Sequence, residues 1–256
     1  MDGLFSTLGM TPILFAFALA ASLLGGVVKG AVGFGLPLVL VASLATFLPP
    51  DTALAMLLIP TVTSNVVQVL WQGVGASWVS VKMIRRFLII GLVALVISAQ
   101  LVGILPPKTL FLLIGLIIVI LSMAQLMGWR IPLHKGRSIV EVILAILAGF
   151  SGGIAGVPGP PTVMYLTALD MPKEKSMQVQ GMVYLLASVA LMVAHIQSGV
   201  LRLAVVPMGM LMLIPAVLGM YIGGKLHNRM DQKRFRFLTL ILLTIAGLNL
   251  IRRGVM

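Results

Sequence analysis

The sequence contains no cysteine and few charged residues, and each shortage excludes classes of protein. Without cysteine there are no disulfides, no cysteine-ligated metals and no thiol catalysis. Charged residues make up 9% of the 256 residues, and 60% of the residues are hydrophobic. Soluble domains are nearer about 25% charged. The chain is therefore predicted to be a membrane protein and not a water-soluble one.

Acidic residues are especially scarce, with six Asp and Glu against 18 Lys and Arg. In a soluble protein a net charge of +12 would suggest nucleic acid binding. Here the basic residues cluster in short loops between apolar runs, where they mark the cytoplasmic side, so we expect no nucleic acid partner. The N-terminus has Asp2 and no Lys or Arg before Lys29, so it lacks the basic start of a signal peptide.

Long runs without charge predict ten apolar helices. These helices are expected at about residues 11–28, 36–48, 52–72, 86–105, 109–129, 138–156, 160–171, 177–195, 203–224 and 236–251. The second and seventh would each cover only about 20 Å, against a hydrocarbon core of about 30 Å. Whether these two cross the membrane or return to the same side stays open.

The Lys and Arg residues of the loops predict the orientation. With ten passages, 13 of them fall on one side and four on the other. The positive-inside rule then places the first side in the cytoplasm and both termini outside the inner (plasma) membrane. If the two short helices returned to the side they came from, every later loop would still lie on the same side as with ten passages, so the predicted orientation would not change.

The second half of the sequence repeats the first after a shift of 123 residues. The shift matches seven identical pairs: Leu24 with Leu147, Gly26 with Gly149, Gly30 with Gly153, Gly33 with Gly156, Pro37 with Pro160, Ala45 with Ala168, and Pro49 with Pro172. We expect one membrane domain made of two repeats, residues 1–130 and 136–256. Each repeat has five helical segments, so the second enters from the opposite face and the repeat is inverted, as in many secondary transporters.

Each half has a stretch dense in Gly and Pro between its first two helices, at residues 25–37 and 149–161. Glycine allows positive φ and proline suits the first turn of a helix, so each stretch predicts a helix, a break and a second helix. In a membrane a broken backbone persists only where it is buried in protein or lines a cavity. Paired breaks therefore predict the transport site.

The chemistry expected at the breaks is anion binding. A helix that begins near Pro37 or Pro160 presents free N–H groups and the positive end of its dipole to the break. Lys29 adds a full charge, its counterpart in the second half is Gly152, and no acidic residue is near it in sequence. A cation at membrane depth indicates function. The alternative is that Lys29 lies in a cytoplasmic loop and only adds to the charge bias.

Other intramembrane polar residues are less informative. Asn65, with Gln68 one turn away, and the hydroxyls of Ser151 and Thr162 could bind an oxyanion or join neighbouring helices. His195 could titrate in a proton-coupled cycle or be passive. No cofactor or metal is expected. The predicted substrate-binding residues are Lys29, Gly30, Gly33, Gly35, Pro37, Asn65, Ser151, Gly153, Gly156, Gly159, Pro160 and Thr162.

The two breaks read KGAVGFGLP at residues 29–37 and GGIAGVPGPP at residues 152–161, and Asn65 follows in the next helix. In these motifs, and in length and duplication, the chain resembles the TauE/SafE family of sulfite-exporter-like permeases. The resemblance covers essentially the whole chain. It implies an inner-membrane carrier of sulfur-containing oxyanions such as sulfite, sulfoacetate or other organosulfonates, driven by the proton gradient.

The sequence thus predicts an all-α polytopic membrane protein that acts as a secondary transporter of small anions. An anion channel and a non-transporting accessory subunit are the alternatives. An enzyme is not expected, because there is no His-Glu zinc motif and no Asp pair. Nucleotide-driven transport is not expected either, because there is no nucleotide-binding P-loop. The expected partners are the lipid bilayer, the anion and protons. A homo-oligomer, the exact substrate and the direction of transport stay open.

Overall fold

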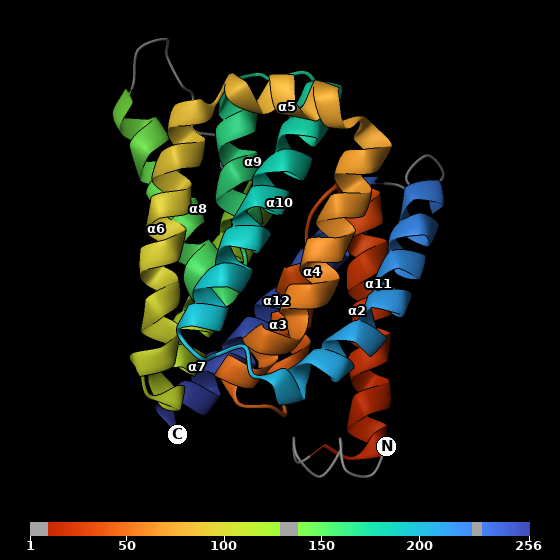
Figure 1. The fold of residues 1–256 in the computed structure, drawn as a ribbon, viewed down its shortest axis with the longest axis vertical. Coiled ribbons are helices and arrows are strands. Elements are labelled where there is room, and N and C mark those ends of the chain that lie inside the picture. The colour runs from red at the N-terminus through yellow and green to blue at the C-terminus, as the bar shows by residue number, and fades with distance from the viewer. Residues whose placement is uncertain (1–9, 129–137, 227–231) are drawn as a thin grey trace.

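The protein is a bundle of helices that run mostly along its long axis (Figure 1). The computed structural model describes residues 10–128, 138–226 and 232–256, and the statements below concern these residues. The helices are α2 (Pro12–Val32), α3 (Leu36–Leu44), α4 (Pro50–Gln72), α5 (Val74–Lys82), α6 (Arg85–Ile104), α7 (Pro107–Leu126), α8 (Ser138–Ala155), α9 (Gly159–Ala168), α10 (Lys173–Gln197), α11 (Val206–Leu226) and α12 (Gln232–Val255), with a 3-10 turn at Leu203–Val205.

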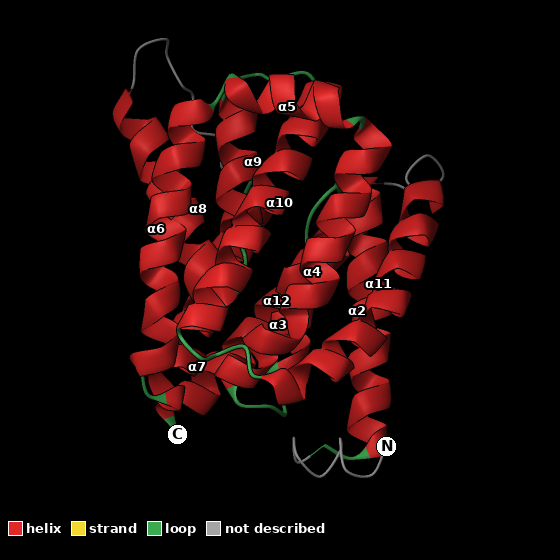
Figure 2. Cartoon of the chain, viewed as in Figure 1, coloured by secondary structure: helices red, strands yellow, loops and turns green. Residues whose placement is uncertain are grey.

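The described residues contain no strand (Figure 2), and seven of the described helices are long and apolar enough to cross a membrane. These seven are α2, α4, α6, α7, α10, α11 and α12. The predicted all-α polytopic membrane fold is confirmed. The short helices α3 and α9 have nine and ten residues, so each covers only about half of the roughly 30 Å hydrocarbon core.

All ten predicted helices are present with ends that differ from the prediction by up to four residues, and α5 is an additional helix. The first helix continues to Val32, so Lys29 and Gly30 lie in its last turns and not in the break. The segment 73–82 was expected to be a loop, yet it forms α5, which lies across one end of the bundle (Figure 1). Its sequence is too short and too mixed in polarity to stand out in a search for spanning helices.

Helix α5 has the character of a helix that lies at a membrane surface. Trp78 and Val79 are about half or more exposed, at 47% and 66%, whereas Ser77 and Ser80 on the other face are buried. The Lys82 ammonium lies 5.7 Å from the centre of the Trp78 ring. An exposed apolar face with a Trp and a Lys is typical of helices at the lipid–water interface.

The bundle has an interior and an outer ring. The interior consists of the short helices α3 and α9 and the long helices α4 and α10, and α2, α6, α7, α8, α11 and α12 surround them. The outer helices pack in pairs, with α2 along α11, α6 along α8, and α7 along α12. Each of these pairs joins a helix of the first half to one of the second, so the two halves share a single core.

Glycines matched by the 123-residue shift make matching contacts. A Cβ on Gly26 would lie 2.2 Å from the Ala216 carbonyl oxygen of α11, and one on Gly149 would lie 2.2 Å from the Gly91 oxygen of α6. The backbones therefore touch at both places. A helix of the first half thus contacts the second half at Gly26, and a helix of the second half contacts the first at Gly149. A two-fold axis between inverted halves would produce this arrangement. The inverted repeat and its division at 1–130 and 136–256 stay predictions.

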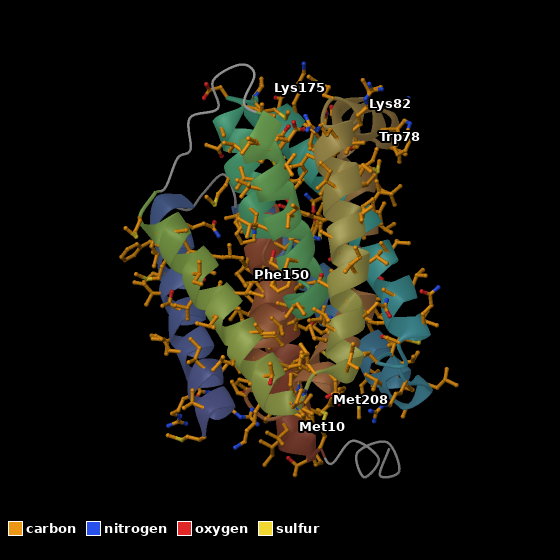
Figure 3. The ribbon with its side chains drawn as sticks, turned by 90° about the vertical axis from the view of Figure 1, so that its left-hand side faces the viewer. Met10, Trp78, Lys82, Phe150, Lys175 and Met208 are labelled. Atoms are coloured by element: carbon orange, nitrogen blue, oxygen red, sulfur yellow. The ribbon has the colours of Figure 1, made fainter. Side chains whose placement is uncertain are left out.

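Helix α2 begins and α12 ends at the same end of the molecule, which we call the terminal end, and α5 lies at the opposite end, which we call the α5 end (Figure 1). Trp78, Lys82 and Lys175 lie at the α5 end, and Met10 and Met208 at the terminal end (Figure 3). Several basic residues in the charge count lie outside the described residues, namely Arg130, Lys135, Arg137 and Arg229.

Candidate functional site

The first break joins α2 to α3 through three residues. Gly33 ends α2 with φ of 86°, and its N–H donates to the Lys29 carbonyl at 2.7 Å. Gly35 has φ of 108°, a conformation that residues with a side chain rarely adopt, and Pro37 occupies the first turn of α3. The first turn of α3 therefore presents the N–H groups of Leu36 and Leu38 toward the break.

The second break joins α8 to α9 and is closed by its own hydrogen bonds. The Ser151 hydroxyl donates to the Val157 carbonyl at 2.9 Å, and the Thr162 hydroxyl donates to the Pro158 carbonyl at 2.7 Å. Both hydroxyls predicted to bind substrate are thus engaged in holding the backbone. The next two residues of α9 after Gly159 are prolines without an N–H, so this helix start offers fewer donors than α3.

Residues 149–153 match the pattern G-x-S-x-G, which serves as a nucleophile turn in some hydrolases. In this protein the five residues lie inside α8, whereas a nucleophile turn joins a strand to a helix. The Ser151 hydroxyl faces its own backbone, as described above. The pattern carries no catalytic arrangement here.

The two breaks meet at one cavity, which we call the central cavity. Seven of the predicted site residues line it: Lys29, Gly35, Pro37, Asn65, Gly156, Gly159 and Pro160. Its other walls are mainly apolar side chains of α3, α4, α6 and α10. The described residues that line it include no Asp or Glu.

Lys29 is the only charged residue among the described residues that line the central cavity, and it is 2% exposed. Its ammonium donates to the Asn65 side-chain oxygen, and the two ion pairs of the described residues lie elsewhere. The Asn65 side-chain nitrogen donates to the Tyr184 carbonyl at 2.8 Å and to the Ser188 hydroxyl at 2.9 Å. A buried ammonium without a carboxylate partner is stabilised by an anion.

The remaining predicted residues lie next to the central cavity without lining it. Gly30 and Gly153 pack against the backbones of α11 and α6, where a Cβ would come within 2.1 Å and 2.0 Å of the nearest atom. Gly33 lies beside the buried amides of Gln68 and Gln180. Ser151 and Thr162 hold the second break. In this structure these five make packing and backbone contacts, and their part in substrate binding stays a prediction.

Sequence reasoning missed several residues that line the central cavity. Thr61, Tyr184 and Ser188 were not singled out, because isolated hydroxyls in apolar helices carry little signal. One signal was present: Ser188 lies 123 residues after Asn65, so the repeat makes the two positions equivalent. Their hydrogen bond is the contact expected where a symmetry axis passes between equivalent helices.

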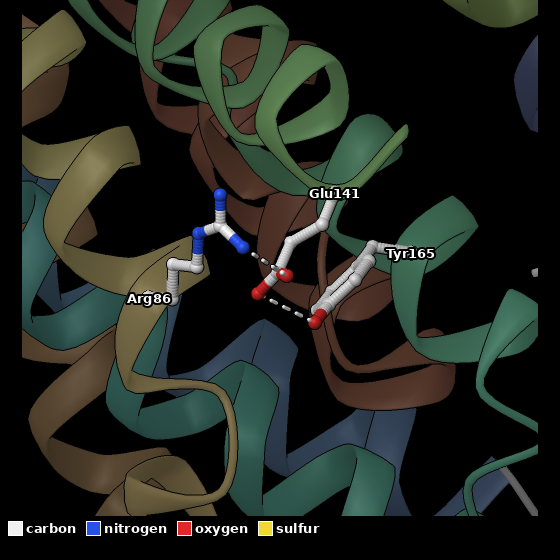
Figure 4. Close-up of polar contacts among 3 residues, drawn as sticks. All are labelled: Arg86, Glu141 and Tyr165. Carbon is white, nitrogen blue, oxygen red and sulfur yellow. Dashed lines mark hydrogen bonds and ion pairs between the residues drawn. The ribbon is translucent and has the colours of Figure 1, made fainter. Parts of the chain in front are cut away.

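The outer ends of both short helices are tied to the surrounding ring. At the end of α9, the Tyr165 hydroxyl donates to the Glu141 carboxylate at 3.1 Å, and Arg86 lies 3.9 Å from the same carboxylate (Figure 4). After α3, the Arg253 guanidinium of α12 donates to the Ala45 carbonyl. These contacts hold the outer ends of α3 and α9 against the ring and so help to position the ends that face the central cavity.

Comparison with known proteins gives one match. Residues 18–250 fit the family model described as sulfite exporter TauE/SafE. The chain belongs to the TauE/SafE family. The match spans both breaks, the central cavity and nearly all the membrane helices, and it confirms the resemblance noted from the motifs. No curated protein and no solved structure matches the chain.

Members of the TauE/SafE family are transporters, and the seven long apolar helices agree with a multi-pass membrane protein. The family assignment makes the central cavity the natural candidate for the transported solute. The family's solutes are sulfur-related anions.

Proposed function

We propose that this TauE/SafE protein is a secondary carrier of small sulfur oxyanions or organosulfonates, which bind in the central cavity beside Lys29. The observation that carries the proposal is the buried Lys29 ammonium, held by Asn65 and facing a cavity without carboxylates. The N–H groups at the start of α3 would add donors to the same anion.

The polarity of the central cavity fits this class of ligand. Thr61 contributes a hydroxyl that has no hydrogen-bond partner among the described residues, and apolar side chains form most of the remaining wall. A tetrahedral or pyramidal oxyanion with a short organic tail could use both surfaces. Small-molecule sites commonly combine an apolar wall with a few placed polar groups.

The mechanism we infer is alternating access between two inverted repeats, with the proton gradient as the driving force that the family resemblance implies. The central cavity lies between helices of both halves, where transporters of this architecture bind their solutes. A channel or an accessory subunit is the alternative. Saturable counterflow exchange in proteoliposomes is expected for a carrier, whereas flux that does not saturate would show a channel.

Ligand-induced thermal stabilisation of the purified protein tests the binding site. Sulfite and organosulfonates are expected to stabilise the wild type, with carboxylates weaker, and a ligand at 100 times its Kd adds about 2.7 kcal/mol. Lys29→Met keeps the length of the side chain and removes its charge, so we expect it to lose about 10- to 100-fold in affinity. Unchanged binding by Lys29→Met would show that the anion binds elsewhere.

A further inference from the structure

The two breaks have equivalent surroundings that differ in chemistry. The position of a Cβ on Gly33 lies 3.4 Å from Gln180 Oε1 and 3.9 Å from Gln68 Nε2. The same position on Gly156 lies 3.3 Å from a Leu57 methyl group and 3.9 Å from a Leu191 methyl group. Each break therefore lies against one side chain of α4 and one of α10.

The 123-residue shift relates these two sets to each other. It takes Gly33 to Gly156, Gln68 to Leu191, and Leu57 to Gln180. The same three positions thus occur twice in the molecule, once with two amides and once with two leucines. Two repeats that share a fold keep the geometry, so the difference in side chains is the feature to explain.

The two pairs lie on opposite sides of the central cavity. On α4, Leu57 lies one turn before Thr61, and Gln68 lies one turn after Asn65 toward α5. On α10, which runs the other way, Gln180 lies one turn before Tyr184, which also lines the cavity. The amide pair therefore lies between the central cavity and the α5 end. Toward the terminal end, Leu191 itself lines the central cavity and Leu57 does not.

The amides are buried without full hydrogen bonding. Gln68 is 3% exposed and Gln180 is 6% exposed. Both side-chain atoms of Gln68 and the oxygen of Gln180 have no hydrogen-bond partner among the described residues, while the Gln180 nitrogen donates to Ser176 at 3.1 Å. Buried amide groups are normally paired, so an unpaired set next to a cavity indicates a place for a hydrogen-bonding ligand.

The leucine pair has the opposite character. Leu57 is fully buried and Leu191 is 3% exposed, and both belong to the main apolar core. Apolar side chains in contact give neither water nor an anion a hydrogen bond, so they form a barrier.

We propose that Gln68 and Gln180 form a second binding site for the transported oxyanion, on its route between the central cavity and the α5 end. Leu57 and Leu191 close the equivalent route toward the terminal end. The inference rests on the proposed transport function. The amide nitrogens would donate to the anion, and the amide oxygens would accept from its bound water or from its protonated form.

Exchanging side chains between equivalent positions tests the transport role. In Gln68→Leu/Gln180→Leu the central cavity is unchanged, so we expect thermal stabilisation by sulfite and organosulfonates to persist while the initial transport rate falls at least tenfold. In Leu57→Gln/Leu191→Gln we expect a leak that does not saturate. A wild-type rate in the first variant would overturn the second site and leave the central site standing. A wild type that neither binds nor transports these anions would overturn both.

Cysteine accessibility tests the asymmetry without relying on transport. Because the chain has no cysteine, single substitutions have no background. We expect Gln68→Cys and Gln180→Cys to react with sulfonatoethyl methanethiosulfonate at least ten times faster than Leu57→Cys, with the reagent supplied in turn from each side of the membrane. Leu191 lines the central cavity and is therefore left out of this comparison. Equal rates for the amide positions and Leu57→Cys would overturn the proposal even if every exchange variant failed to fold.

Discussion

Asn65 positions Lys29, and it has no free hydrogen-bond donor left for a ligand in this structure. Both hydrogens of its amide nitrogen are used, one by the Tyr184 carbonyl and one by the Ser188 hydroxyl, and its oxygen accepts from Lys29. One side chain thus joins α2, α4 and α10. At the scale of single residues, the charge of Lys29 faces the central cavity because Asn65 holds it there.

Asn65→Asp therefore makes a specific prediction. The new carboxylate has nearly the same shape but would neutralise Lys29 at close range, so we expect anion affinity to fall at least tenfold, or about 1.4 kcal/mol. Ligand-induced stabilisation measures the change. Ser64→Ala is the matched control, because Ser64 is adjacent and fully buried but its hydroxyl donates to the Thr61 carbonyl within α4. Undiminished affinity in the Asn65→Asp variant would contradict a role for the Lys29 charge.

At the scale of elements, contacts between helix backbones decide the packing of the outer ring. Gly219 and Gly223 of α11 face α2, and a Cβ on either would lie 2.1 Å from a backbone oxygen of Leu23 or Val27. Small residues allow membrane helices to approach this closely. The α2–α11 and α6–α8 pairs hold the long helices from which the two breaks depart.

Gly223→Ala is expected to lower stability by about 1–3 kcal/mol, since the added methyl must push two backbones apart. Gly224→Ala on the same helix is the matched control, because nothing lies within 4 Å of its Cβ position. The loss of folded protein during heating in detergent would show the difference. Equal thermal stability of the two variants would mean that α2 and α11 do not pack as described.

At the scale of the whole molecule, we propose that the α5 end faces the cytoplasm and the terminal end faces outward. The basis is the charge bias of the loops together with the separation of the two ends in the structure (Figure 3). Met83 follows α5 and is 64% exposed, and Met256 is the last residue and is 79% exposed.

Single cysteines at these two positions test the orientation, because neither substitution removes a positive charge. In intact cells an impermeant thiol reagent is expected to label Met256→Cys and to spare Met83→Cys. Inside-out vesicles should give the reverse pattern. Labelling of Met83→Cys from outside the cell would invert the proposed topology.

Much of the architecture could be predicted from the sequence, because membrane helices leave long charge-free runs and repeats leave Gly and Pro in register. The ten helices, the two breaks and the family followed from such local patterns. Helix α5 was not predicted, because a short helix across one end of the bundle needs neither the length nor the uniform hydropathy of a spanning helix. The end of α2 was placed too early, because Lys29 and Gly30 look like a break until the packing against α11 is known.

The sequence by itself determined that this is a membrane protein with two Gly- and Pro-rich breaks and one lysine beside the first that has no counterpart at the second, because composition and spacing can be read along the chain. Only the tertiary structure decided which polar residues meet. It brought Asn65 to Ser188, engaged Ser151 and Thr162 in their own backbone, and set two glutamines opposite two leucines. The contact of Asn65 with Ser188 and the placement of the glutamines and leucines depend on packing between α4, α10 and the breaks, which lie far apart in the sequence. The bonds of Ser151 and Thr162 are local, but they form only once the second break has its folded shape.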